Sequence, residues 1–233
     1  MENIVDSNEN NIPNIRNNYT VTDKADGDRK LLYVSENGKL YLIDTNMKVN
    51  FTGAKTSEKK LFNSLLDGEH ILYDKNGKFL NMYAAFDIYY KHEESVRELE
   101  FINIIDETVE NPEPVDKSKY RLYLLKEFVE DLKIYSILDK KNSGNEVKTS
   151  ANNKPLPILI TCKEFIVQSK NISIFDGCST ILSKVKDNIF KYNTDGLIFT
   201  PANMAVGSDT VGGLPGPLSK NTWIHSFKWK PPE

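Results

Sequence analysis

The feature that most constrains the fold is a strand–turn–strand pattern that occurs twice in the first ninety residues. Each copy has two alternating segments around an Asn-Gly turn: residues 31–35 and 39–44 around Glu36-Asn37-Gly38, and residues 69–73 and 78–83 around Lys75-Asn76-Gly77. Asn and Gly tolerate the positive φ angles of tight hairpin turns. The pattern therefore predicts neighbouring hairpins and an antiparallel sheet.

The remaining chain alternates between strand-like, helix-like and polar stretches. Further strands are predicted over residues 19–24, 83–90, 156–167, 197–200 and 223–230, helices over 120–138 and 181–190, and loops over 143–157 and 201–219. This mixture favours the α+β class, with antiparallel β-sheets flanked by helices. Residues 1–18 are polar and Asn-rich, which predicts a linker or disordered arm, and residues 19–233 are expected to form one domain.

Composition limits the class of protein. The net charge of -3 and a pI of about 5.8 argue against a protein that coats nucleic acid, although a local basic cleft is compatible with them. Cys162, Cys178 and the three histidines lack metal-site spacing, so neither a zinc site nor a disulfide scaffold is indicated. With no run of about 20 apolar residues and no signal-peptide pattern, we expect an intracellular, reduced protein without a membrane segment.

The first segment that can carry chemistry is Lys24-Ala25-Asp26-Gly27-Asp28-Arg29, between two predicted strands. A lysine amine can act as a covalent nucleophile when it is neutral. Gly27 would let a ligand approach the backbone closely, and the planar guanidinium of Arg29 suits ribose or phosphate. The same residues are equally compatible with a solvated turn.

Four later segments join carboxylates, aromatic residues or paired lysines to predicted strands: Leu66-Asp67-Gly68-Glu69, Ala85-Phe86-Asp87-Ile88, Thr194-Asp195-Gly196-Leu197-Ile198-Phe199 and Phe227-Lys228-Trp229-Lys230-Pro231. Carboxylates beside glycine suit a metal or a ribose hydroxyl, and an aromatic residue at a strand end can stack on a base. Two lysines on one strand face suit a triphosphate. Surface turns, a core aromatic and an edge strand guarded by lysines explain each segment equally well on its own.

The order of the five segments is more informative than any one of them. Across residues 19–233 the chain resembles the covalent nucleotidyltransferase superfamily, which contains mRNA capping enzymes and ATP- or NAD-dependent polynucleotide ligases. The five segments correspond to its motifs I, III, IIIa, IV and V. The resemblance implies an ATP-grasp-like nucleotidyltransferase domain, and because the sequence stops directly after motif V, one without the C-terminal OB-fold.

Three details favour the capping branch. Ligases usually carry a glutamate two positions before the nucleophile, where this chain has Thr22. Lys163-Glu164-Phe165 is similar to a capping-enzyme segment that meets guanine O6, and the segment from Phe227 to Glu233 looks like the capping version of motif V. The amino-acid sequence of these motifs is most similar to that of capping enzymes of large cytoplasmic DNA viruses.

The resemblance implies GTP and 5′-diphosphate RNA as substrates, with transfer of GMP through a covalent lysyl-GMP intermediate. It implies the following roles: Lys24 as nucleophile, Lys228 and Lys230 as its catalytic partners, Arg29 at the ribose, Phe86 and Ile198 around guanine, Lys163 at guanine O6, Thr22 and Glu69 in the nucleotide site, and Asp195 with Glu69 at Mg²⁺ or Mn²⁺. It further implies fused or associated triphosphatase, OB-fold and cap methyltransferase domains. The expected location is the host cytoplasm, in a viral factory, or the virion.

Two other functions stay open at this point. An RNA or DNA ligase would adenylylate Lys24 and prefer ATP. A noncatalytic nucleotide-binding or scaffold module would bind GTP without forming any adduct. The sequence does not indicate what the long loop over residues 202–219, rich in glycine and proline, does.

Overall fold

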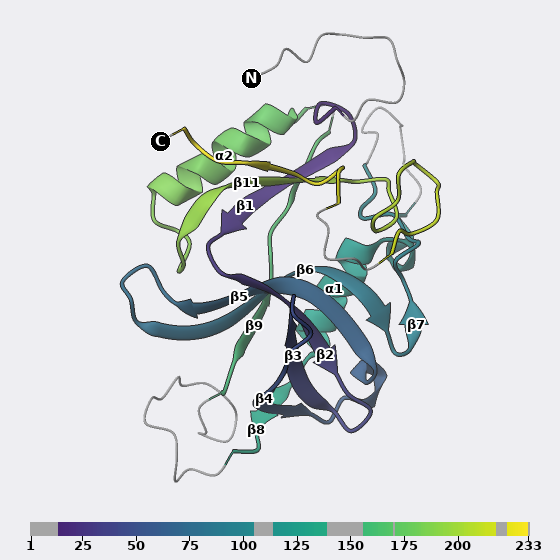
Figure 1. Cartoon of the computed structure of the whole chain (residues 1–233). Helices are drawn as coiled ribbons and strands as arrows, with labels where there is room; N and C mark the ends of the chain where they lie inside the picture. Colours follow the sequence, from purple (N-terminus) through teal and green to yellow (C-terminus); the bar gives the residue numbers. More distant parts are fainter. Residues whose placement is uncertain (1–13, 105–113, 139–155, 170, 218–222, 233) are drawn as a thin grey trace.

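The described part of the chain folds as two mainly antiparallel sheets, the smaller lying above the larger in Figure 1. The computed structural model describes residues 14–104, 114–138, 156–169, 171–217 and 223–232. The smaller sheet has the order β10 (Ile166–Val167), β1 (Tyr19–Ala25), β11 (Thr194–Pro201) and β12 (Phe227–Trp229). The α+β class expected from the sequence is confirmed.

The larger sheet contains the two predicted hairpins. Its order is β7 (Glu94–Ser95), β6 (Phe79–Lys91), β5 (Ser64–Tyr73), β2 (Asp28–Val34), β3 (Lys39–Asp44), β4 (Val49–Thr56) and β8 (Ile134–Ser136), with β9 (Leu159–Cys162) parallel to β6. Buried apolar residues such as Leu32, Leu66 and Ile88 form its core. Consecutive strands β1 and β2 belong to different sheets, so the short connection between them passes from one sheet to the other.

Two helices cover the sheets (Figure 1). Helix α2 (Ile174–Lys186) packs on β1 through Ile174 and Ile181, and Ser173 and Asp176 form a capping box at its start. Helix α1 (Arg121–Asp131) packs on β6 and buries Leu122, Leu125 and Phe128 in the larger core. Short 3-10 helices occupy Lys59–Leu61 and Lys117–Lys119. In the described part of the chain, neither α-helix is long and apolar enough to cross a membrane.

Both helix predictions had wrong boundaries. The helix predicted over 120–138 ends at Asp131, because residues 134–136 pair with the exposed edge of β4 as strand β8. The helix predicted over 181–190 starts seven residues earlier, at its capping box, and ends at Lys186 before Asn188 adopts a φ of 58°. The capping pattern is visible in the sequence and is the signal that the prediction missed.

Several strand predictions also need correction. The strand predicted over 156–167 is two short strands, β9 and β10, that belong to different sheets. Only Phe227–Trp229 of the predicted strand 223–230 is extended, and β4 was not predicted at all. Residues 202–217 lack helix and strand as expected, yet Ala202 and Met204 in this loop are buried.

Some predictions concern residues outside the described ranges, namely most of the arm 1–18, the loop 143–155 and residues 218–219. Within residues 14–18, Ile15 packs against the core of the smaller sheet. The domain boundary at residue 19 stays a prediction.

Candidate active site

The connection between the two sheets carries the lysine segment. Lys24 lies near the end of β1, and Arg29 lies at the start of β2. A Cβ added to Gly27 would lie 2.7 Å from the His70 backbone oxygen and 3.0 Å from Cγ of Glu69. Only glycine allows this close approach, which brings the end of β1 against β5. The first two sequence segments, 24–29 and 66–69, therefore meet in space.

Asp195 joins two of the predicted catalytic lysines. Its Oδ1 lies 2.5 Å from Nζ of Lys24, and its Oδ2 lies 2.7 Å from Nζ of Lys230. Burial raises the pKa of the Asp195 carboxyl, but hydrogen bonds from Lys230 and Lys24 outweigh it and lower that pKa overall. The carboxylate therefore stays ionised and holds both ammonium groups at one point.

A glycine fixes how β12 sits on β11. Gly196 has a φ of 147°, and a Cβ there would lie 1.9 Å from the backbone oxygen of Trp229. Ile198 on β11 lies between its two ladder partners, Thr22 on β1 and Lys228 on β12. Because residues opposite one another in a sheet share a face, these three side chains lie on one face of the smaller sheet. Lys228 is exposed, and the described residues include no ion-pair partner for it.

Arg29 is held by Asp67, which belongs to the second of the five sequence segments, and by Tyr89, which sequence analysis did not identify. Its Nη2 lies 2.6 Å from Oδ2 of Asp67, and its Nε lies 3.0 Å from Oδ1. The hydroxyl of Tyr89 donates to Oδ2 of Asp67 at 2.5 Å. The hydrogen bonds that Arg29 donates to Asp67 raise the pKa of Arg29. The planar fork of Arg29 is thus fixed in one orientation, with its side chain 47% exposed.

Glu69 is a partly buried carboxyl among charges of both signs. Burial raises its pKa to about 7, whereas the nearby ammonium groups of Lys163 and Lys24 lower it. Asp67 and Asp28 add to the increase. Glu69 therefore changes protonation state near neutral pH.

Lys163 forms a buried ion pair. Its Nζ donates to Oδ2 of Asp23 at 2.8 Å and to the backbone oxygen of Asp23 at 2.6 Å. Burial lowers the pKa of Lys163 although Asp23 opposes the shift. The hydroxyl of Thr22 donates to the backbone oxygen of Glu164 at 2.6 Å, which ties β1 to this segment. Two of the three ammonium protons of Lys163 are thus used within the protein, and its Nζ also lies 5.9 Å from the centre of the Tyr192 ring.

Phe86 lies on β6 in the larger sheet, where the pairing with β5 shifts between Asp67 and Gly68. Phe86 is the residue left without a partner at this irregularity, and it is half-buried. The backbone N–H of Lys163 bonds to the neighbouring carbonyl of Ala85 at 2.8 Å. Phe86 and Lys163 are therefore adjacent, whereas Ile198 belongs to the other sheet.

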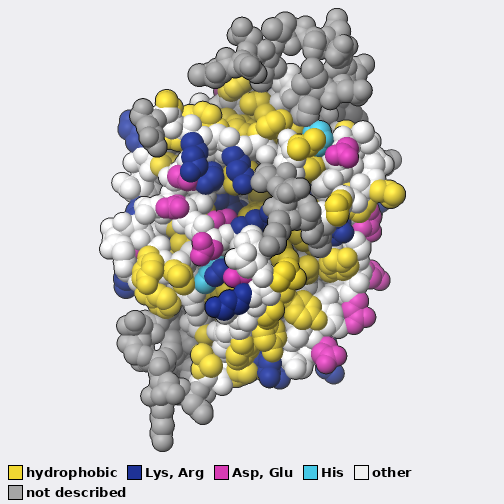
Figure 2. Space-filling model, in the orientation of Figure 1, with side chains coloured by type: hydrophobic (Ala, Val, Ile, Leu, Met, Phe, Trp, Pro, Cys, Tyr) yellow, Lys and Arg dark blue, Asp and Glu magenta, His cyan; other side chains and the backbone are white. Residues whose placement is uncertain are grey.

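The residues predicted to hold a metal supply two carboxylates, Asp195 and Glu69. No cluster of three or more metal-ligating side chains occurs in the part of the chain that is described. Mg²⁺ is commonly held by one or two carboxylates together with substrate phosphates, so this donor set fits a metal that arrives with a nucleotide. Figure 2 shows Lys and Arg side chains gathered with acidic ones on the upper half of this face.

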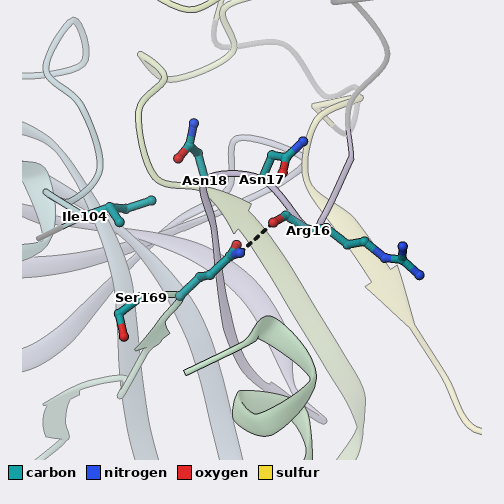
Figure 3. Close-up of a pocket in the computed structure, with 6 residues that line it drawn as sticks. Arg16, Asn17, Asn18, Ile104 and Ser169 are labelled. Atoms are coloured by element: carbon teal, nitrogen blue, oxygen red, sulfur yellow. Dashed lines mark hydrogen bonds between the residues drawn. The ribbon is translucent and has the colours of Figure 1, made fainter. Parts of the chain in front are cut away.

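A separate hollow of about 500 Å³ lies at the other end of β1 (Figure 3). Its lining residues are Arg16, Asn17, Asn18, Ile104, Gln168 and Ser169. Gln168 Nε2 donates to the Arg16 backbone oxygen at 2.6 Å. None of the predicted site residues lines this hollow, so we do not place the active site there.

Comparison with known proteins gives the class of the chain. Residues 5–139 match the family described as mRNA capping enzyme, catalytic domain. The probable mRNA-capping enzyme of Acanthamoeba polyphaga mimivirus is 30% identical over 245 residues, an alignment that covers 99% of this chain and 20% of the relative. The chain thus spans about a fifth of that protein's length.

Two solved structures share low sequence identity with the chain. Mycobacterial DNA ligase D complexed with ATP and MES has a TM-score of 0.48 at 12% identity, over 91% of this chain and 54% of the ligase. The ligase domain of M. tuberculosis LigD has a TM-score of 0.45 at 11% identity, over 91% and 53%.

The family match extends over more than half of the chain, which is enough to assign the chain to that family. The chain belongs to the mRNA capping enzyme catalytic-domain family.

Proposed function

We propose that this domain transfers GMP from GTP to the diphosphate 5′ end of RNA through a covalent adduct on Lys24. The observation that carries the proposal is the meeting of Lys24, Asp195 and Lys230 at 2.5 Å and 2.7 Å, beside Glu69. In a capping-enzyme domain, this is the place where a lysine, a second cation and two carboxylates can act on one triphosphate.

In the first step, the Lys24 ammonium must release a proton to solvent water before its nitrogen attacks. The lone pair of its neutral amine then forms a bond to the α-phosphorus of GTP, and the bond from that phosphorus to the bridging oxygen breaks. Pyrophosphate leaves with the electron pair. Asp195 holds the amine in place until the triphosphate arrives, and Lys230 and Lys228 offset the charge that develops on the phosphate.

In the second step, a terminal oxygen of the RNA diphosphate attacks the same phosphorus. The nitrogen–phosphorus bond breaks, Lys24 takes up a proton, and GpppN-RNA is released. Dividing the transfer at a covalent intermediate replaces one difficult encounter with two easier ones.

We propose the remaining contacts that the family resemblance implies. Phe86 from the larger sheet and Ile198 from the smaller sheet enclose guanine, and the remaining proton of Lys163 reaches guanine O6. Arg29 holds the ribose, Glu69 contributes to the nucleotide site, and Thr22 keeps the Lys163 segment against β1. Mg²⁺ or Mn²⁺, held by Asp195 and Glu69, would supply neutralisation of the leaving pyrophosphate.

We also propose the partner domains and the cellular location that the family resemblance implies. The domain would work with triphosphatase, OB-fold and cap methyltransferase domains, either fused to it or associated with it. Its expected location is the host cytoplasm, in a viral factory, or the virion.

The experiment that tests the proposal follows a label from GTP to RNA. The chain is incubated with Mg²⁺ and with GTP labelled at the α-phosphate. Three separate incubations contain the same RNA with a monophosphate, a diphosphate or a triphosphate at its 5′ end. We expect label on the diphosphate RNA alone, and none with Lys24→Ala. Label on the monophosphate RNA, or on diphosphate RNA with Lys24→Ala, would contradict the proposal. The assay is repeated with an OB-fold domain added, because that domain is a proposed partner.

A further inference from the structure

Arg121 is one of the largest side chains that are completely buried in the described part of the chain, with 0% exposure. It lies at the start of α1 and forms a two-pronged pair with Asp87, from Nε to Oδ1 at 2.8 Å and from Nη2 to Oδ2 at 3.1 Å. Its Nη1 donates to the backbone oxygens of Leu99 and Met204, the latter at 3.0 Å. A buried charge is costly unless it is paired in this way.

The partner of Arg121 lies directly beside the group that holds Arg29. Asp87 on β6 stands opposite Asp67 on β5 in the sheet register. Asp67 is 0% exposed and Asp87 is 9% exposed, so water screens their mutual repulsion poorly. Like charges directly opposite in a sheet are destabilising. Burial raises the pKa of Asp87, and Asp67 adds to the increase, whereas Arg121 opposes it.

The four side chains therefore form two ion pairs back to back. Arg121 pairs with Asp87 inside the protein, and Arg29 pairs with Asp67 nearer the surface, where Arg29 is 47% exposed. The inner pair connects the outer one to helix α1 and, through Met204, to the loop after β11. That loop is the glycine- and proline-rich segment for which the sequence suggests no role.

We propose that Arg121 is a positioning residue for the bound nucleotide. Its positive charge offsets the carboxylate of Asp87. Asp67, opposite Asp87, can then keep its carboxylate on Arg29 in the orientation that meets the ribose. Arg121 itself does not touch the nucleotide. The inference rests on the proposed function, because that function places the ribose at Arg29.

Arg121 could act by offsetting the charge of Asp87, or only by anchoring the chain through its bonds to Leu99 and Met204. These two roles predict different effects of substitutions. The test measures GTP affinity by calorimetry in a Lys24→Ala chain, so that no adduct forms. Arg121→Met is expected to weaken GTP binding about tenfold. Arg121→Met combined with Asp87→Asn is expected to return within about threefold of the parent chain, because both opposed charges are then absent. The bonds to Leu99 and Met204 are lost in both variants, so anchoring alone predicts no recovery.

A second comparison links the effect to Arg29. When Arg29→Ala is already present, adding Arg121→Met is expected to change GTP affinity less than about twofold, because the group that Arg121 positions has gone. A full tenfold further loss would overturn the inference. So would a double variant, Arg121→Met with Asp87→Asn, that binds GTP as weakly as Arg121→Met alone.

Thermal unfolding of each variant shows whether it folds. If Arg121→Met does not fold, Arg121→Lys is used in its place. Lysine keeps the charge but cannot make the four bonds, so affinity within about threefold of the parent chain is expected. A tenfold loss in a folded Arg121→Lys chain would overturn the inference. If the parent chain itself binds no GTP, the proposed function fails; if it binds and the recovery is absent, only the inference fails.

Discussion

Glu69 carries the clearest consequence at the scale of a single residue. Burial raises its pKa from an ordinary value of 4.5 to about 7. Between these values the folded protein binds this proton more tightly than the unfolded chain does. Stability contributed by the protonated carboxyl is therefore lost as pH rises from about 4.5 to about 7.

Glu69→Gln cannot ionise at this position, so the variant does not undergo this loss. The stability of the variant relative to that of the unchanged protein should therefore increase as pH rises. We expect its advantage to increase by on the order of 1–2 kcal/mol between pH 5 and pH 8, after allowance for solvent screening of a partly exposed group. Thermal unfolding at both pH values measures it, as an extra difference of about 2–8 °C. A stability difference that stays constant from pH 5 to pH 8 would contradict the assignment.

Candidate site residues could be predicted from the sequence, but one of their pairings could not. Lys24, Asp195 and Lys230 were predicted as site residues, and the structure brings them together. The pairing of Arg29 with Asp67 was not predicted, because these residues are 38 positions apart and meet only through the register of β2 on β5. Such non-local register depends on the packing of the whole sheet, which local sequence patterns do not specify.

At the scale of an element, strand β12 depends on a glycine in its neighbour. Gly196→Ala would place a Cβ 1.9 Å from the Trp229 backbone oxygen, in a backbone conformation with a φ of 147°. We expect a loss of at least about 2 kcal/mol of stability, together with displacement of Lys228 and Lys230. The measurements are chemical denaturation and the rate of adduct formation with GTP.

Gly77→Ala is the matched control for Gly196→Ala. Gly77 also has a positive φ, 76°, but a Cβ there would meet no atom within 4 Å. It should cost about 1 kcal/mol from backbone strain alone and leave adduct formation unchanged. Equal loss of adduct formation in both variants would show that the contact between β11 and β12 does not matter for the chemistry.

Elements with strong local signals were predicted well. The two hairpins follow from Asn-Gly turns between alternating segments, and both are present as β2–β3 and β5–β6. Strand β4 was missed because Val49 and Phe51 are exposed and Gly53 interrupts the pattern at a φ of 81°. Its extended form comes from pairing with β3 and β8, which is tertiary information.

At the scale of the whole molecule, GTP should tie the two sheets together, since the proposed contacts Ile198 and Phe86 belong to different sheets. In a Lys24→Ala chain, GTP at 100 times its Kd should add about 2.7 kcal/mol of stability. The unfolding midpoint would then rise by about 5–10 °C. ATP at the same concentration should raise it less, because it lacks the guanine O6 that we place at Lys163. An equal rise with both nucleotides would contradict selection of guanine.

The central claim is that Lys24 carries GMP, and the intact mass of the protein tests it most directly. The chain is incubated with Mg²⁺ and either GTP or ATP, and Lys24→Ala serves as the control. The same incubations are repeated with an OB-fold domain added. We predict that GTP adds one guanylyl group to the unchanged chain and nothing to the variant. A gain of one adenylyl group would instead identify a ligase, and GTP binding without a mass gain, even with the OB-fold domain present, would identify a noncatalytic nucleotide-binding module.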